Sequence, residues 1–482
     1  MILPNAACSV LAVANEGEGR YSDDKGLRDP PGSVDIIWDF WARSPSVHRV
    51  SLRSLGGDKA LEEKGVHLPL SLNAMTYWER FSGLDLNFTA ARRAYRTDSN
   101  LEPEYLGWSS DDSKLFVNLQ ENNAVATISF SQWSDPRATD IDALGLKDWS
   151  AMGGTRGLDI VEDQRCRSAR YPGFFGLRHA DGIAVVEVDG YDYILTANEG
   201  DDKSYGDFEE LVGEDEVLDA KGQVLMKNVV ATDQVVASHL AGLKLGGSPE
   251  RRIGRGSSAM DFSDPGRPVL RRLVSHGARG ISIFKKTDRG LELVWDSGSD
   301  LEREQCAAFP WAHNGEQDEE FAPLFGVLYN TTDDADLREA IEENNDPDEK
   351  GCEDGGDGQS GACPLGQTVD ARSPKDGAAP EAVAVGVACG RLLAVTATEK
   401  QGTAFVYDIT DIKRPQLLFT RHLSPVSRTK NPGVAYEARE LGEVDPEGLV
   451  FVQAAESPSG KAGFFFAGAF SGTVSFWEFQ CP

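Results

Sequence analysis

The chain has 482 residues and a formal net charge of −30, with 48 Lys and Arg against 78 Asp and Glu. So large a negative excess argues against nucleic acid or an anionic membrane surface as the main partner, because the phosphate field would repel the chain. Apolar residues at 40% and charged residues at 26% are ordinary for a folded protein. Gly is frequent, at 50 residues, and Met is rare, at 5, which favours turn-rich β structure over helix bundles.

One unit of alternating strands and tight turns recurs along the chain. In each copy an acidic residue precedes a short apolar strand, a Gly/Asp/Ser turn leads into a second strand, and a Glu follows before a third strand. Period-2 strands joined by tight turns predict an antiparallel meander, and meanders that begin 66 to 100 residues apart predict propeller blades. In chain order the copies are residues 3–19, 103–130, 180–205, 280–298, 380–409 and 446–479.

The repeats predict an all-β fold, a single β-propeller domain over residues 1–482, of the seven-bladed type. Six blades are at least partly visible, because segment 280–298 shows only the later strands of a copy. An all-β sandwich also shows alternation and turns, but the recurring Pro-Glu start favours the propeller. Long insertions interrupt the repeats at about 41–101, where we expect a mixed segment with helix, and at 206–279 and 299–378.

Acidic residues stand at two fixed places in the repeats. In a meander, the start of the first strand and the end of the second lie on one rim, and the first strand lines the channel of a propeller. The last copy departs from the pattern, with Phe470 where a Glu would stand. Up to eight carboxylates therefore point toward one mouth of the channel. With the nearby Asp201, the candidate metal ligands are Glu16, Glu104, Glu121, Asp181, Glu199, Asp201, Glu381, Glu399 and Glu447.

Like charges placed together cannot all stay ionised without compensation. Lys or Arg could pair with them, protons could be retained, or a cation could bind; Arg20, Lys203 and Lys400 are close enough in sequence to pair with some. Hard oxygen ligands suit Ca²⁺ or Mg²⁺, and neutral oxygens would come from Asn15, Asn122, Asn123 and Asn198. The alternative is that each acid accepts backbone N–H bonds and holds blade geometry.

The cysteines and sequons bear on the compartment. Cys352 and Cys363 lie eleven apart in a Gly/Asp-rich loop, which fits either a disulfide in an oxidising compartment or two solvated thiols, and the odd total of seven cysteines leaves at least one free. Two sequons, at Asn87 and Asn330, give weak support for secretion. No stretch approaches the roughly 18 apolar residues of a membrane span. We interpret the calcium-loop-like stretch 346–357 as a flexible acidic loop.

Motifs of established chemistry are absent from the sequence. It contains no Gly-x-Ser-x-Gly elbow, no phosphate-binding Gly-x-x-x-x-Gly-Lys loop and no His-Glu-x-x-His zinc motif. The seven histidines are scattered. His179, beside Asp181, and His276, before the strand at 280, are near repeat landmarks, and we interpret both as hydrogen-bonded structural residues.

Several phrases resemble the choice-of-anchor I family of extracellular β-propellers, which includes mesenchyme-specific cell surface glycoproteins. The resemblance covers most of residues 4–479, and its most specific phrases are LQENN at 119–123 and ANEGD at 197–201. It implies secretion or surface anchoring, and some relatives carry the label of an atypical alkaline phosphatase or phytase-like esterase. Family members usually have a signal peptide and a further segment before the position of Pro4, which leaves open a truncated N-terminus and a missing blade.

Three functions follow as hypotheses. The leading one is a secreted or surface-displayed propeller that binds a divalent cation, with Ca²⁺ as the expected cofactor, and presents a rim for an extracellular ligand or matrix. The alternative is a calcium-dependent phosphomonoesterase, in which Lys203 and Lys400 contact the phosphate and the metal ligands are Glu121, Glu199, Asp201 and Glu381. The third is a purely structural propeller whose acids are all paired internally.

Overall fold

The computed structural model describes residues 1–130, 135–150, 157–245, 251–316, 363–430 and 432–481. The chain divides into two compact units. The first unit is Met1–Leu158 with Ala169–Asp296, and the second is Asp159–Ser168 with Ser297–Pro482.

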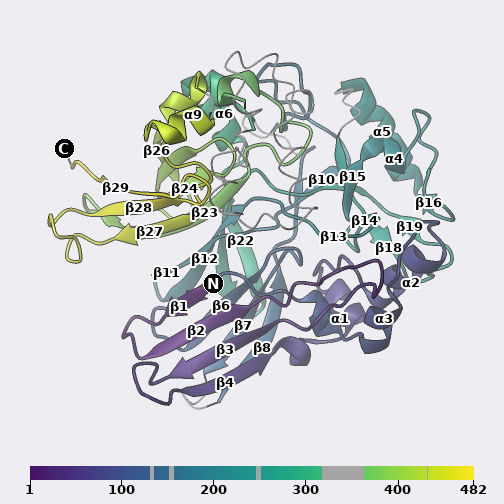
Figure 1. The fold of residues 1–482 in the computed structure, drawn as a ribbon, viewed down its shortest axis with the longest axis horizontal. Helices are drawn as coiled ribbons and strands as arrows, with labels where there is room; N and C mark the ends of the chain where they lie inside the picture. Colours follow the sequence, from purple (N-terminus) through teal and green to yellow (C-terminus); the bar gives the residue numbers. More distant parts are fainter. Residues whose placement is uncertain (131–134, 151–156, 246–250, 317–362, 431, 482) are drawn as a thin grey trace. The chain divides into compact units, whose positions relative to one another are not determined.

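The first unit contains three four-stranded antiparallel sheets (Figure 1). The first sheet has the order β1-β2-β3-β4, with β1 (Ile2–Pro4), β2 (Val10–Asn15), β3 (Ser33–Trp38) and β4 (Ser46–Ser51). The second is built from β5 (Leu106–Trp108), β6 (Lys114–Leu119), β7 (Ala124–Phe130) and β8 (Pro136–Ala143). The third has the order β11-β12-β21-β22, with β11 (Ile183–Val188), β12 (Tyr191–Asn198), β21 (Gly280–Thr287) and β22 (Gly290–Asp296).

The third sheet corrects the number of blades expected from the repeats. The segments 180–205 and 280–298 were counted as two copies, but Asn198 of β12 pairs with Gly280 of β21 in one sheet. The insertion at 206–279 therefore interrupts a single sheet between its second and third strands. In the first sheet, likewise, β4 (Ser46–Ser51) supplies the fourth strand, so the insertion expected from residue 41 begins after it.

Apolar side chains pack these sheets against one another. Phe116 and Val117 are neighbours on β6, so they point to opposite faces of the second sheet. Val117 belongs to a buried cluster that includes Ile36 of the first sheet. Phe116 belongs to another cluster, with Ile194 and Phe284 of the third sheet. The middle sheet is therefore buried on both faces, which explains why its strands read as nearly continuous apolar runs.

Short elements fill the insertions of the first unit. The expected helical segment after residue 41 contains α1 (Asp58–Glu63), α2 (Leu72–Arg80) and α3 (Thr89–Ala94). The order β20-β10-β9 forms a small sheet of β9 (Leu146–Asp148), β10 (Phe174–Leu177) and β20 (Leu273–Ser275). The remaining elements are β13 (Ser204–Tyr205), β14 (Phe208–Glu209), β15 (Leu211–Gly213), α4 (Glu214–Val217), β16 (Val230–Ala231), α5 (Asp233–Leu245), β17 (Arg252–Gly254), β18 (Met260–Asp261) and β19 (Val269–Leu270).

The second unit contains one four-stranded and one three-stranded antiparallel sheet. The larger sheet has β23 (Pro380–Ala388), β24 (Arg391–Thr398), β25 (Thr403–Asp408) and β26 (Gln416–His422). The smaller sheet has β27 (Gly448–Val452), β28 (Gly463–Gly468) and β29 (Thr473–Glu478). A shared core of buried side chains, including Val395 and Phe464, joins them. The described helices of this unit include α6 (Asp300–Ala308) and α9 (Pro432–Glu437).

The same hairpin turn recurs in the two units. Asp189-Gly190 joins β11 to β12, and Cys389-Gly390 joins β23 to β24. All four residues have positive φ, between 52° and 76°, which is the conformation of the two-residue type I′ turn. Asp and Gly adopt it readily, and Cys389 is held there by a disulfide to Cys481.

Two disulfides are described, and both lie in the second unit. Cys389 is bonded to Cys481, and Cys166 to Cys306. Cys8 is exposed and unpaired, which agrees with the odd cysteine count. The predicted pairing of Cys352 with Cys363 and the acidic stretch 346–357 lie outside the described residues, wholly or in part. Among the described helices, none has the length and apolar character that crossing a bilayer requires.

Candidate metal centre

Three of the predicted ligands meet in the first unit. Glu16 follows β2, Glu104 precedes β5 and Glu121 follows β6, as the repeat pattern placed them. One carboxylate oxygen of each lies within 4.8 Å of the others. The sheet ends of two adjacent sheets therefore bring these three glutamates together, and we call them the glutamate cluster.

Burial makes this cluster costly to ionise. It raises the pKa of Glu121 to about 8, with the charge of Asp201 adding to the effect. Burial, and then the charges of Glu121 and Asp181, raise the pKa of Glu104 well above its usual value. The pKa of Glu16 is also raised by burial and by Glu18. Without a bound cation, the cluster therefore retains protons near neutral pH.

Two oxygens of the cluster are left without hydrogen bonds. Glu104 and Glu121 share a side-chain hydrogen bond with each other. Glu104 Oε1 and Glu121 Oε2 are buried and have no hydrogen-bond partner among the described residues. Buried polar atoms are normally paired, so these two oxygens are open to a ligand.

Lys203 pairs with an acid, as the sequence allowed, but its partner is not one of the predicted ligands. Its ammonium pairs with the buried Glu102, and the side chain is only 5% exposed. Burial lowers the pKa of Lys203 to about 8, although the surrounding acids, Asp29 first among them, oppose this. The lysine is therefore enclosed beside the acidic region, and its contact with a phosphate stays a prediction.

The other predicted acids are divided between the two units. In the first unit, Glu199 accepts a hydrogen bond from the Gln120 amide at 2.6 Å, and Asp201 and Asp181 act on the glutamate cluster through their charges. The second unit contains Glu381, Glu399 and Glu447. There Glu399 pairs with Lys400, as the sequence allowed, and burial followed by the charge of Glu399 raises the pKa of Glu447.

Two of the four asparagines expected to offer neutral oxygens hold loops instead. Asn123 Oδ1 accepts the backbone N–H groups of Arg178 and His179, at 2.9 and 3.2 Å. Asn198 Oδ1 accepts the Thr196 hydroxyl at 2.8 Å. These oxygens already accept hydrogen bonds, and their role as cation ligands stays a prediction.

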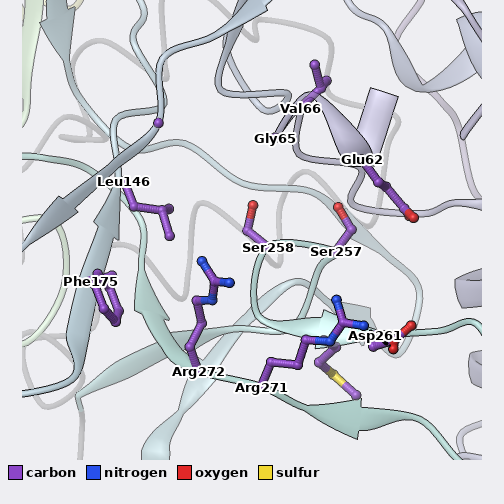
Figure 2. Close-up of a pocket in the computed structure, with 12 residues that line it drawn as sticks. Glu62, Gly65, Val66, Leu146, Phe175, Ser257, Ser258, Asp261, Arg271 and Arg272 are labelled. Atoms are coloured by element: carbon purple, nitrogen blue, oxygen red, sulfur yellow. Dashed lines mark hydrogen bonds and ion pairs between the residues drawn. The ribbon is translucent and has the colours of Figure 1, made fainter. Parts of the chain in front are cut away.

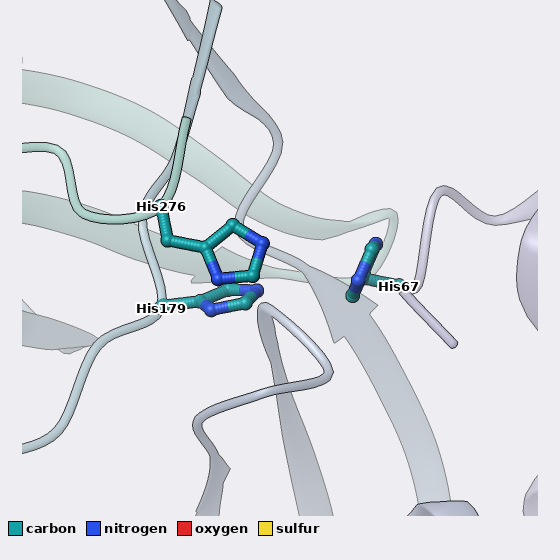
Figure 3. Close-up of side chains that lie close together, drawn as sticks. All are labelled: His67, His179 and His276. Atoms are coloured by element: carbon teal, nitrogen blue, oxygen red, sulfur yellow. The ribbon is translucent and has the colours of Figure 1, made fainter. Parts of the chain in front are cut away.

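A second cluster was missed by the sequence analysis. His67, His179 and His276 are at most 2% exposed, and one ring nitrogen of each lies within 4.8 Å of the others. Figure 3 shows the rings of His179 and His276 close together, with His67 facing them from the other side. The centroids of the His179 and His276 rings are 4.3 Å apart. The sequence did not predict that these histidines lie together, although the contact of His179 Nδ1 with the Asp201 carbonyl agrees with a hydrogen-bonded residue.

A pocket of mixed polar and apolar lining begins next to this histidine cluster. It has a volume of about 490 Å³, and its lining includes Val66 and Ser258, which neighbour His67 in sequence or by hydrogen bond. Figure 2 shows Arg272 extending toward Ser258 and Arg271 toward Asp261, with which Arg271 forms an ion pair. Both arginines are exposed, but the lining also contains Glu62 and Asp261, so the charges of the pocket are mixed.

The sequence matches one known protein family over most of its length. The sequence profile of the choice-of-anchor I domain matches residues 1–327 and 361–412, well over half of the chain. The chain belongs to the choice-of-anchor I family. No curated protein matches its sequence significantly. The disulfides of this choice-of-anchor I protein agree with an extracellular or surface location.

Comparison with solved structures adds weaker likenesses. The chain is similar to a periplasmic gluconolactonase of Pseudomonas aeruginosa, at 11% identity and a TM-score of 0.29, over 99% of this chain and 84% of that one. It is also similar to a protein from Lactobacillus plantarum, at 9% identity and a TM-score of 0.31, over 98% and 67% of the two chains. TM-scores this low carry no argument about fold or activity.

Proposed function

We propose that this protein is a secreted or surface-displayed β-propeller that binds Ca²⁺ and presents a rim to an extracellular ligand or matrix. The observation that carries the proposal is the glutamate cluster, in which Glu16, Glu104 and Glu121 converge within 4.8 Å. The consecutive face-to-face packing of four-stranded sheets in the first unit supports a β-propeller. Secretion is supported by the disulfides and the family membership.

Calcium is the cation that the cluster fits best. The cluster offers carboxylate oxygens, and Ca²⁺ binds several such oxygens at once in a flexible geometry. Two of those oxygens, on Glu104 and Glu121, are buried without partners among the described residues. A bound cation would replace the retained protons and remove the repulsion that raises these pKa values.

Equilibrium binding of Ca²⁺ to the full chain tests the proposal. Wild type should take up about one Ca²⁺ at the cluster, and extracellular sites of this kind bind with a Kd of roughly 0.1–1 mM. The variants Glu104→Gln and Glu121→Gln should lose this binding, while Glu63→Gln, an exposed acid of the same unit, should keep it. Equal binding by all four proteins would show that the cluster is not the site.

A second candidate function is a calcium-dependent phosphomonoesterase. The observation in its favour is the pocket with Arg271 and Arg272, because guanidinium groups recognise phosphate oxygens. Hydrolysis of p-nitrophenyl phosphate, with Ca²⁺ and then with a chelator, measures this activity. Arg272→Gln should lower kcat/KM, and the exposed Arg289→Gln should not. No hydrolysis by wild type with Ca²⁺ would remove this candidate.

A further inference from the structure

We propose that His67, His179 and His276 form a binding site for a zinc-class divalent metal ion, separate from the calcium site. Three imidazoles with their nitrogens within 4.8 Å of one another match the ligand set of zinc sites that keep one position open. Imidazole nitrogen suits Zn²⁺, Cu²⁺, Fe²⁺ and Ni²⁺ rather than Ca²⁺. The inference therefore stands independently of the proposed function.

The fold explains why two of the rings meet. β10 and β20 pair in parallel, with Gly176 opposite Ser275. The chain leaves both strands at the same end, and His179 and His276 follow directly. His67 comes from the helical insertion, where its backbone N–H donates to Asn122 O at 2.9 Å. Three segments far apart in sequence thus converge on one point inside a single unit.

His179 already has the hydrogen bond expected of a metal ligand. Its Nδ1 lies 2.7 Å from the carbonyl oxygen of Asp201, so Nδ1 carries the proton and donates it. This fixes the lone pair on Nε2, which is buried without a partner among the described residues. Metal-bound histidines almost always donate their second ring N–H to a carbonyl or carboxylate in this way.

His67 has the corresponding contact with a carboxylate. Its Nδ1 accepts the backbone N–H of Ser258 at 3.1 Å, so Nε2 carries the proton and donates it to Glu210. Glu210 is fully buried. The lone pair that remains for a metal is on Nδ1, and metal binding at that atom replaces the contact with Ser258.

His276 is the least satisfied of the three. Neither of its ring nitrogens makes a hydrogen bond of good geometry within the described part of the chain, although the Asp201 carbonyl lies near the ring. Its Nε2 is 3.9 Å from Glu210 Oε1. Two unpaired nitrogens on a residue that is 2% exposed call for a partner.

The backbone is shaped to hold the rings. A Cβ added to Gly254 would lie 2.7 Å from His276 Nε2, and one added to Gly256 would overlap His67 and Glu210. His179 itself has a φ of 38°, a left-handed conformation that is costly for a residue with a side chain. Two of the rings are packed against glycines, and the third residue has a strained backbone. Both features indicate that the surrounding fold holds the three histidines in place.

Metal content of the intact protein tests the inference. After removal of metal with a chelator and reloading with Zn²⁺, wild type should hold roughly one tightly bound Zn²⁺ per chain that excess Ca²⁺ does not displace. The variants His179→Gln and His276→Gln should lose it, and His48→Gln, a histidine of β4 outside the cluster, should retain it. Absence of tightly bound Zn²⁺ from wild type, or equal retention by the cluster variants, would overturn the proposal.

Two further measurements test the site without removing one of its histidines, in case a histidine variant misfolds. X-ray absorption of zinc-loaded wild type should show three imidazole nitrogens at about 2.0–2.1 Å, and a shell of oxygens alone would contradict the site. Glu210→Gln should weaken Zn²⁺ affinity by about 10–100-fold, because it weakens the acceptor for His67 without removing a ligand. An unchanged affinity would exclude His67 as a carboxylate-supported ligand.

Discussion

The carbonyl oxygen of Asp201 lies 2.7 Å from His179 Nδ1, while the carboxylate of the same residue raises the pKa of Glu121. Asp201, in the loop after β12, therefore contacts the histidine cluster through its backbone and acts on the glutamate cluster through its charge. The two candidate metal sites share this link but differ in donor chemistry, nitrogen in one and oxygen in the other. Each can thus be removed and measured without the ligands of the other.

The first prediction concerns Glu121→Gln. Without a cation, folding at pH 7.5 forces Glu121 to take up a proton that its carboxylate does not hold in the unfolded chain, which costs free energy. The variant should therefore be more stable than wild type by roughly 1–3 kcal/mol at pH 7.5 in chelator. Wild type should gain about 1.4 kcal/mol from Ca²⁺ at ten times its Kd, and the variant should gain nothing. Thermal unfolding with and without Ca²⁺ checks both the higher stability of the variant in chelator and the stability that wild type gains from Ca²⁺. Glu63→Gln serves as the control.

The second prediction concerns Gly254→Ala. Its new methyl group meets the His276 ring at 2.7 Å, so the free energy of unfolding should fall by about 1–3 kcal/mol. Gly57→Ala is the matched control, because nothing lies within 4 Å of its added Cβ, and we expect a change within about 0.5 kcal/mol. Chemical denaturation measures both. Equal stability of the two variants would mean that the ring is not packed against β17.

The third prediction concerns pH and His422, a histidine outside both clusters. Burial lowers its pKa to about 3, and its Nδ1 accepts the Ser424 N–H at 3.0 Å. Because the folded pKa is depressed, its stabilising contribution is complete above about pH 6.5 and is lost as the pH falls toward 3, at about 1.4 kcal/mol per pH unit. His422→Asn keeps an acceptor but does not titrate there.

Denaturation curves at several pH values between 4 and 7, about one unit apart, check this prediction. The loss of stability on acidification should be shallower for His422→Asn than for wild type, and unchanged for His48→Gln. Parallel curves for His422→Asn and wild type would contradict the assignment of acid sensitivity to this residue.

The fourth prediction concerns the disulfide between Cys389 and Cys481. It ties the β23–β24 turn to the end of the chain across 92 residues. The double variant Cys389→Ser, Cys481→Ser should lose about 2–4 kcal/mol of stability, because the unfolded chain regains the freedom that the bond removes. Cys8→Ser, at an exposed free cysteine, should change nothing. Thermal unfolding of both variants separates these outcomes.

Much of the β structure could be predicted from the sequence, because strand period and turn chemistry are local properties. The strands and the acids at their ends, such as Glu104 and Glu121, stand where the repeats placed them. The joining of 180–205 with 280–298 could not be predicted, since a long insertion separates β12 from β21 and pairing across it leaves no local signal.

The histidine cluster escaped prediction for a related reason. His67 and Glu210 lie in two different insertions and approach one another only through tertiary packing. The repeats pointed to His179 and His276 as neighbours of landmarks, but nothing in their spacing showed that β10 and β20 run in parallel. The pairing of Lys203 with Glu102 could not be predicted either, because the two residues are far apart in sequence.

The most direct test of the central claim is calorimetric titration of Ca²⁺ into metal-free protein, for wild type and Glu121→Gln side by side. The account predicts about one binding event per chain in wild type, with a Kd of roughly 0.1–1 mM, and its loss in the variant. Identical titrations for the two proteins, or no heat of binding in wild type, would contradict it.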